Sequence, residues 1–308
     1  MISKISIIGA GNVGATCAQR IADKGYADIV LVDIIEGLPQ GRALDMLESA
    51  PILGSDAHII GTNSYQETAN SDVVIITSGI TRKPGMSREE LLQTNANIVA
   101  GVVRNAANYS PNCIIIMVTN PLDVMTYLAL RVSQFSRDKV MGLSGVLDAA
   151  RLRSFIAAEL NVSVEDVSAC ILGQHGAAMV VIPRLTTVGG VPITKLLPQE
   201  TINKLVERTT GAGAEIINLV KTGSAFYAPS AAVAQMVEAI VLDKRRILPC
   251  ATYLDGEYGI KDSVTTVPVK LGKNGIEQII ELELTDEEKS ALASAANGVR
   301  ELVRAIKL

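Results

Sequence analysis

Three observations predict an α/β fold, with a doubly wound parallel sheet in the first half and an α+β arrangement in the second. Short β-branched segments alternate with segments of helical periodicity in the first half, as in a βαβ array. These strand segments are largely apolar and show no polar–apolar alternation, which is typical of a parallel sheet covered on both faces. A glycine-rich turn joins the first strand to the first helix.

The first half contains a series of predicted strands with helices between them. The strands are expected at residues 4–8, 29–32, 57–60, 73–77 and 113–118. Helical periodicity covers residues 12–24 and 88–108. Strands alternating with helices in this way predict parallel pairing through crossover connections.

The second half mixes longer helices with separate strands. Helices are expected at 147–160, 202–222 and 230–242, and strands at 168–172, within 180–193, at 247–254 and at 263–271. A last helix follows Thr285, with acidic residues in its first turn, where they suit the helix dipole. The pattern of alternating strands and helices ends near residue 142. This change predicts two domains, 1–142 and 143–308, that share an interface.

Composition excludes several classes of protein. The chain has 308 residues, with 28 lysines and arginines against 32 aspartates and glutamates, and this balance argues against a nucleic-acid binder. Apolar runs such as 73–76 are far shorter than the roughly 18 residues of a membrane span. Only 19 % of residues are charged and the mean hydropathy is +0.30, which predicts burial against copies of the same chain.

Cysteine spacing and the start of the chain bear on compartment and metal content. The four cysteines are widely separated and form no C-x-x-C pair, so neither a zinc site nor a disulfide framework is expected. The first residues lack a basic segment and a small-residue cleavage site. We therefore expect a protein of the reducing cytoplasm that holds no metal.

The glycine-rich turn has the G-x-G-x-x-G pattern of the Rossmann fold, formed by Gly9, Gly11 and Gly14. Its glycines permit a tight turn, a close approach of a pyrophosphate and close packing of helix on strand, while the helix N-terminus attracts phosphate. Asp33 ends the second strand about 20 residues on and suits the ribose hydroxyls of NAD, because it repels the 2′-phosphate of NADP. Glycines that serve packing alone are the alternative.

His175 is the candidate proton donor or acceptor. It lies between glycines after an apolar run, where a substrate can approach closely, although a lone histidine in such company is often an ordinary core residue. A carboxylate must orient it, and Asp148 is the candidate. Asp148 and Arg151 are three residues apart on one helix, so they also form an ordinary intrahelical ion pair in the simpler interpretation.

A basic loop at residues 81–88 is a candidate anion site. It contains Arg82 and Arg88 but no acid, and cations at the start of a helix oppose the helix dipole. A solvated basic loop is the alternative. Asn120, which precedes Pro121, offers an amide to a substrate hydroxyl or carbonyl, or else forms a plain turn or helix cap.

Together these motifs resemble the lactate/malate dehydrogenase superfamily, and within it the malate dehydrogenases of the lactate-dehydrogenase-like group. The matching segments follow the family's order and cover nearly the whole chain. They are Gly9–Gly14, Val32-Asp33-Ile34, residues 82–88, 118–123, 148–151 and 173–176, and Lys221-Thr-Gly-Ser224-Ala.

The resemblance implies the roles of individual residues in substrate binding and proton transfer. His175 would exchange the proton at C2 of the substrate, with Asp148 fixing its tautomer. Arg151 would bind the C1 carboxylate as a bidentate pair. Asn120 would orient the reacting oxygen.

The remaining implied residues surround the substrate and the cofactor. Arg88, on a loop that closes over the substrate, would polarise the carbonyl, and Arg82 would bind the group at C3. Ser224 would line the substrate pocket. The residues expected to bind NAD are Gly9, Gly11, Asn12, Val13, Gly14, Asp33, Asn95, Val118 and Asn120.

Arg82 favours malate over lactate. The lactate enzymes of the family carry a neutral residue at this position, usually glutamine, whereas oxaloacetate brings a second carboxylate for Arg82 to bind. An unpaired buried charge costs roughly 3–5 kcal/mol, or about two to three orders of magnitude in preference. We therefore expect an NAD-dependent malate dehydrogenase of the tricarboxylic acid cycle, a homotetramer in preference to a dimer. The alternatives are a lactate or broad-specificity 2-hydroxy-acid dehydrogenase and a non-catalytic NAD-binding sensor.

One segment departs from the family pattern. Malate dehydrogenases usually have Gly-Gly-His-Gly-Asp-Glu, whereas Gln174 precedes the histidine in this chain and Ala177 and Ala178 follow it. If Ala177 lies close to His175, the missing carboxylates lower the pKa of the histidine and ease anion binding. Neutral drift with compensation elsewhere is the alternative.

Overall fold

The computed structural model describes residues 2–81 and 85–307, so Arg82 of the basic loop lies outside the described residues. The first half forms the predicted doubly wound parallel sheet, in the order β3-β2-β1-β4-β5-β6. Its strands are β1 Ser3–Ile8, β2 Ala27–Val32, β3 Ile59–Thr62, β4 Val73–Ile76, β5 Ile114–Met117 and β6 Val140–Gly142.

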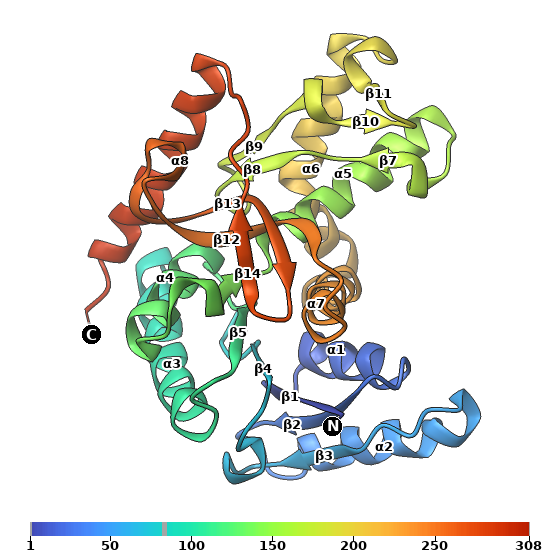
Figure 1. Ribbon diagram of the computed structural model, residues 1–308, viewed down its shortest axis with the longest axis vertical. Coiled ribbons are helices and arrows are strands. Elements are labelled where there is room, and N and C mark those ends of the chain that lie inside the picture. The colour runs from blue at the N-terminus through green and yellow to red at the C-terminus, as the bar shows by residue number, and fades with distance from the viewer. Residues whose placement is uncertain (1, 82–84, 308) are drawn as a thin grey trace.

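Helices cover both faces of this sheet (Figure 1). On one face lie α1 (Asn12–Ala22), α2 (Leu38–Leu53) and α7 (Tyr227–Val241). On the other face lie α3 (Arg88–Tyr109) and α4 (Leu122–Ser133).

The two layers of helices explain why the strands are largely apolar and do not alternate between apolar and polar residues. In β4, Val73 and Ile75 belong to the core that contains α1 and α7, whereas Val74 and Ile76 belong to the core that contains α3 and α4. Successive strand residues face opposite sides of a sheet, so a strand with two covered faces is apolar at most positions, and the buried Ser6 of β1 is an exception whose hydroxyl is paired with that of Ser71.

The second half continues the same sheet with antiparallel strands, in the order β6-β12-β13-β8-β9, and β14 pairs with β13. A three-stranded sheet joins β11, β10 and β7, and α5 packs against α6. The elements are α5 Ser144–Leu160, β7 Val167–Ser168, β8 Ile171–Gly173, β9 Met179–Val181, β10 Thr187–Val188, β11 Val191–Pro192, α6 Gln199–Val220, β12 Arg246–Asp255, β13 Lys261–Gly272 and β14 Gly275–Ile279.

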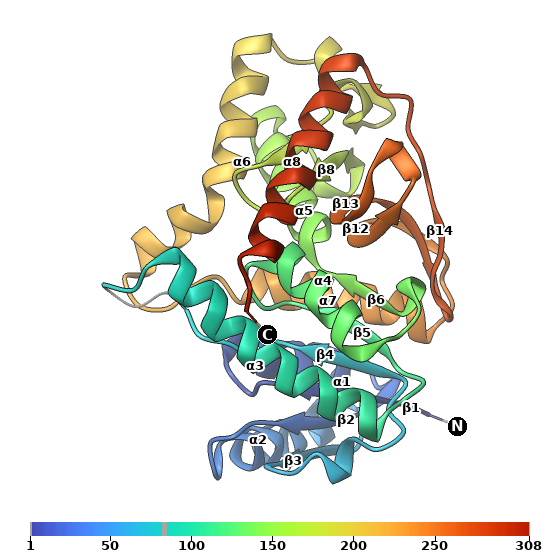
Figure 2. The same cartoon turned by 90° about the vertical axis from the view of Figure 1, so that its left-hand side faces the viewer.

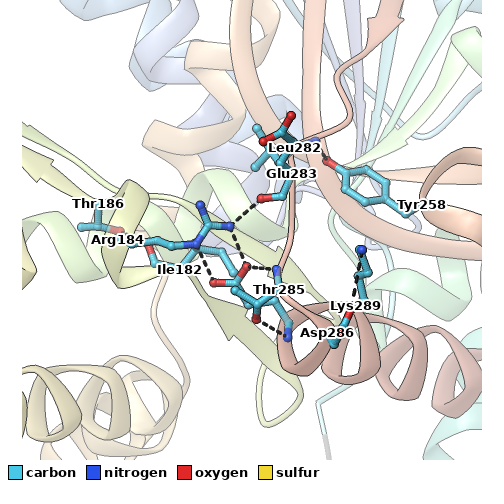
Figure 3. Close-up of polar contacts among 10 residues, drawn as sticks. Ile182, Arg184, Thr186, Tyr258, Leu282, Glu283, Thr285, Asp286 and Lys289 are labelled. Atoms are coloured by element: carbon cyan, nitrogen blue, oxygen red, sulfur yellow. Dashed lines mark hydrogen bonds and ion pairs between the residues drawn. The ribbon is translucent and has the colours of Figure 1, made fainter.

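The last helix, α8 (Asp286–Arg304), connects the two halves. Thr285 and Glu288 form a capping box at its start, and Arg184 donates to both carboxylate oxygens of Glu288 at 3.1 and 2.7 Å (Figure 3). At the other end, past the helix, the main chain of Lys307 exchanges two hydrogen bonds with the side chain of Gln93 on α3. Figure 2 shows α8 running along the molecule towards α3.

The structure corrects several predicted elements. The single strand expected at 168–172 is wrong, because β7 pairs with β10 while β8 pairs with β13 in the other sheet. The strand expected at 57–60 begins at Ile59. The sequence pattern missed α2, α4, β6 and β14. Helix α2 has weak amphipathic character and contains Pro51, α4 is buried over most of its surface, β6 has only three residues, and β14 contains the polar residues Glu277 and Gln278.

None of the helices in the described part of the chain combines the length and the apolar character needed to cross a bilayer.

Candidate functional site

The glycine-rich turn lies at the carboxyl end of β1, beside the point where the strand order reverses between β1 and β4. This is where doubly wound folds bind their ligands. Gly9 has φ +117°, and a Cβ on Gly14 would lie 1.9 Å from the carbonyl oxygen of Gly9. Gly11 is different, because a Cβ there would meet nothing within 4 Å, and as the N-cap of α1 it offers no side-chain cap to the helix. Packing therefore explains Gly9 and Gly14, while Gly11 leaves the helix N-terminus open to a phosphate.

Asp33 joins the end of β2 to this turn. Its Oδ2 accepts a hydrogen bond from the main-chain N–H of Ala10 at 2.7 Å, and its Oδ1 accepts from that of Ile35 at 3.0 Å. The carboxylate is half-buried at the edge of the turn, where it suits a ribose hydroxyl and opposes an added phosphate. Asn12 and Val13 form the first turn of α1 beside it.

Asn95 has a structural role that the sequence did not indicate. It is buried on α3, and its amide accepts from the N–H of Ile80 at 2.8 Å while donating to the carbonyl oxygens of Ile80 and Asn120 at 3.1 and 2.8 Å. It thereby joins the segment after β4 to the segment after β5, which carries Val118. Asn120 itself is exposed at this edge. Contact of Asn95 with the cofactor stays a prediction.

His175 and Asp148 form the predicted pair. Nδ1 of His175 lies 2.8 Å from Oδ2 of Asp148. Asp148 is buried on α5, whereas the histidine side chain is 16 % exposed, on the loop between β8 and β9. A histidine buried only for packing would not reach solvent, and one whose Nδ1 is held by a carboxylate presents Nε2 to a ligand.

A second carboxylate, which the sequence interpretation missed, accepts a hydrogen bond from the main chain of His175. Oδ2 of Asp123, in the first turn of α4, accepts from the N–H of His175 at 2.9 Å. An acid in a first helical turn already suits the dipole, so its position gave no reason to look further. The available signal was an acid next to the core residues Leu122 and Val124.

The charges around His175 set its protonation. Burial alone lowers the pKa of His175, and the cation of Arg151 lowers it too. The anion of Asp148, its hydrogen bond and the anion of Asp123 act in the opposite direction and prevail, so the pKa lies above its ordinary value. The site thus holds a histidine that accepts a proton readily.

Arg151 lies on the same face of α5 as Asp148. Its Nη1 is 3.4 Å from Oδ1 of Asp148, which is the length of a weak ion pair, and its Nε is buried without a protein partner among the described residues. A cleft of about 280 Å³ beside it runs between α5 and α6 and reaches Ala228 of α7. The guanidinium is therefore held at the site while its Nε has no hydrogen-bond partner among the described residues. Ser224 is exposed on the loop from α6 to α7.

Arg88 is exposed at the first position of α3. Ser87 and Glu90 form a capping box there, and Glu89 and Glu90 offset the unfavourable cation at the helix start. Ala177 and Ala178 are exposed on the loop after His175. Within residues 2–81 and 85–307, His, Cys, Asp and Glu side chains form no group that could hold a metal ion.

Comparison with known proteins places the whole chain in one family. The sequence model of the lactate/malate dehydrogenase NAD binding domain matches residues 3–142, and that of the lactate/malate dehydrogenase alpha/beta C-terminal domain matches residues 145–307. A malate dehydrogenase of Thermomicrobium roseum is 58 % identical over 307 residues, covering 100 % of this chain and 99 % of the relative.

Solved structures agree with this assignment. The malate dehydrogenase of Salinibacter ruber has a TM-score of 0.94 and 51 % identity, covering 98 % of this chain and 97 % of that one. A lactate dehydrogenase of Cryptosporidium parvum, complexed with lactic acid and NAD, has a TM-score of 0.95 and 41 % identity, covering 99 % and 98 %. The fold therefore does not distinguish the two substrates.

The two glycines of the turn give a matched test of NAD binding. Gly14→Ala should cost about 1–3 kcal/mol of folding free energy, because its Cβ collides with the main chain of Gly9. Gly11→Ala should leave stability unchanged and weaken NADH at least about tenfold, because it obstructs the pyrophosphate. Thermal unfolding and NADH fluorescence titration measure the two effects.

Gly101→Ala on α3, where a Cβ also meets nothing within 4 Å, is the control. It should lower neither the thermal stability nor the affinity for NADH. Normal NADH affinity in Gly11→Ala would contradict the placement of the pyrophosphate at this turn.

Proposed function

The chain belongs to the lactate/malate dehydrogenase family, and we propose that it interconverts malate and oxaloacetate with NAD as the hydride acceptor. The single observation that carries the reaction is the His175–Asp148 pair beside Arg151, with the NAD-binding turn of Gly9–Gly14 in the first half of the chain. The choice of malate is supported by the relatives named malate dehydrogenase at 54–58 % identity.

Proton transfer falls to His175. In malate oxidation the hydride leaves C2, the O–H bond of the C2 hydroxyl breaks, and Nε2 of His175 takes the proton. Asp148 at 2.8 Å from Nδ1 holds the tautomer in which Nε2 is free to accept, and it stabilises the imidazolium that forms. The chemistry that NAD supplies when bound is the acceptance of the hydride at its nicotinamide ring.

Substrate binding falls to the cations and amides around the histidine. Arg151 binds the carboxylate next to C2, for which its partly used guanidinium has hydrogen bonds available. Asn120 orients the oxygen on C2, Arg88 polarises it in the closed site, and Ser224 lines the pocket. Glycines 9, 11 and 14, Asn12, Val13, Asp33, Asn95, Val118 and Asn120 complete the proposed cofactor site.

Arg82 selects the substrate in this proposal, by pairing with the second carboxylate of malate or oxaloacetate. The alternative of a lactate or broad-specificity 2-hydroxy-acid dehydrogenase is not favoured by the relatives in sequence.

We further propose a division into domains at 1–142 and 143–308, a place in the tricarboxylic acid cycle, and a cytoplasmic protein without nucleic-acid or membrane partners. The four cysteines, all within the described residues, are free thiols, as a reducing compartment would keep them.

A homotetramer is proposed from exposed apolar side chains. On α2, Leu44 and Ile52 are 56 % and 88 % exposed, and Leu219 near the end of α6 is 74 % exposed. Large apolar side chains exposed on helices in this way are typical of surfaces that another chain covers. A second copy is the occupant that the low charge fraction supports.

Substrate preference tests the proposed function. The ratio of kcat/KM for oxaloacetate over pyruvate, from NADH oxidation, should be at least about 100 and should collapse in Arg82→Gln, because the guanidinium loses its partner carboxylate with pyruvate. Arg104→Gln on α3 is the control and should keep the ratio. Equal rates with both substrates would exclude the role of Arg82, and NADH binding without turnover would favour a sensor.

The pH profile tests the state of His175. Malate oxidation needs the neutral imidazole, so its kcat/KM should fall as pH drops through the raised pKa of His175, whereas oxaloacetate reduction needs the imidazolium and should fall as pH rises through the same pKa. Ala177→Asp should move both limbs to higher pH by adding a negative charge. Identical profiles in Ala177→Asp and the parent would rule out any influence of this segment on the histidine.

Light scattering tests the assembly. The parent should have four times the chain mass of 32.6 kDa, and Leu44→Glu should reduce it by placing a charge in the proposed contact. Val162→Glu, at an exposed valine outside α2 and α6, is the control and should keep the full mass. A monomeric parent would refute the tetramer.

A further inference from the structure

Asp123 is a buried carboxylate for which the reaction described above has no use. It lies in the first turn of α4 with 1 % of its surface exposed. Leu122 and Val124 on either side of it belong to the two cores. Ionised side chains are rarely buried in this way without a partner, because removal from water is costly.

Within residues 2–81 and 85–307, the side chain of Asp123 has one hydrogen-bond partner outside its own residue, which is His175. Oδ2 accepts from the main-chain N–H of His175 at 2.9 Å, across 52 residues of sequence. Two other main-chain bonds of this loop stay within the hairpin, from Gln174 to Ala178 and from Met179 to Gly176. Asp123 therefore fixes the histidine from the opposite half of the chain.

The other oxygen of Asp123 is not used by the described residues. Oδ1 is buried and has no hydrogen-bond partner among them. Burial raises the pKa of Asp123 to about 6, although the nearby histidine and its N–H act against this. A helix start that merely needed an acid would be served equally well by an exposed one. Costly buried carboxylates with a defined partner are typical of functional sites.

We propose that Asp123 is a positioning residue, which holds the main chain of His175 in place and adds a second negative charge that favours the imidazolium. This inference rests on the proposed role of His175 as proton acceptor. The two carboxylates divide the work: Asp148 fixes the ring through Nδ1, and Asp123 fixes the main chain that carries the ring.

Three charged groups act on the imidazole from the helices around it. Asp148 and Arg151 face it from α5, and Asp123 faces it from α4. The two anions together outweigh the one cation and the effect of burial. Removing the charge of Asp123 must therefore make His175 a weaker base.

The experiment is a titration of His175 in Asp123→Asn, which keeps the shape and one acceptor oxygen but removes the charge. The chain has only two histidines, and His58 is exposed, so ¹³C-labelled imidazole gives two NMR signals of which His58 is the internal reference. The pKa of His175 should fall by about 0.5–1 unit, with the acidic limb of malate oxidation shifting equally. Oxaloacetate reduction above that pKa should lose about three- to tenfold in kcat/KM.

Asp72→Asn is the matched control. Asp72 also accepts a main-chain N–H from a distant segment, that of Lys4 at 2.9 Å, but lies at the amino end of β4. Asp72→Asn should leave unchanged the pKa of His175 and the pH dependence of both malate oxidation and oxaloacetate reduction. If Asp123→Asn lowers only the melting temperature and leaves the pKa of His175 unchanged, the carboxylate is structural and the proposal is overturned.

A second variant decides the matter if Asp123→Asn does not fold. Asp123→Glu keeps the charge but lengthens the arm, so the pKa of His175 should stay raised while kcat falls at least about tenfold. A parental kcat in Asp123→Glu would overturn the positioning role. Because the NMR titration needs no turnover, it separates failure of this inference from failure of the proposed malate reaction.

Discussion

The packing of Thr266 on β13 is the contact on which the geometry of the site depends. Thr266 pairs with Gly173, the last residue of β8, and its hydroxyl donates to that of Ser144 at the start of α5 at 2.5 Å. Gly145 follows directly, and a Cβ there would lie 2.4 Å from the methyl group of Thr266 and 2.8 Å from the carbonyl oxygen of Pro249. One side chain thus sets the distance between the strand that leads to His175 and the helix that carries Asp148.

The consequence is that the short distance between His175 and Asp148 follows from sheet packing. Asp148 is one turn of helix beyond Ser144, and His175 is two residues beyond Gly173. Because Thr266 holds both Ser144 and Gly173, the side chains of Asp148 and His175 reach their 2.8 Å separation without further rigid support. Asp123 then limits the remaining freedom, which is that of the main chain between β8 and β9.

Sequence patterns predicted most of this fold because its strongest signals are local. Continuous apolar strands, the Gly9–Gly14 turn and the long helices depend on neighbouring residues, and the structure confirms the fold class. The split of residues 168–172 between two sheets depends on distant partners, so no local pattern could reveal it. Asp148 was found because a histidine needs an orienting carboxylate. Asp123 was missed because its partner is a main-chain N–H, which leaves an acid between two apolar residues as the available sequence signal.

Substrate choice is separable from all of these constraints. Asn95 holds both the N–H and the carbonyl oxygen of Ile80, and the capping box of Ser87 and Glu90 fixes the start of α3. The two ends of the basic loop are therefore anchored by contacts that involve neither Arg82 nor the substrate. In the proposed function, a substitution between these anchors would alter the charge that selects the substrate without disturbing either anchor. This explains how a malate dehydrogenase and a lactate dehydrogenase superimpose on this chain with TM-scores of 0.94 and 0.95.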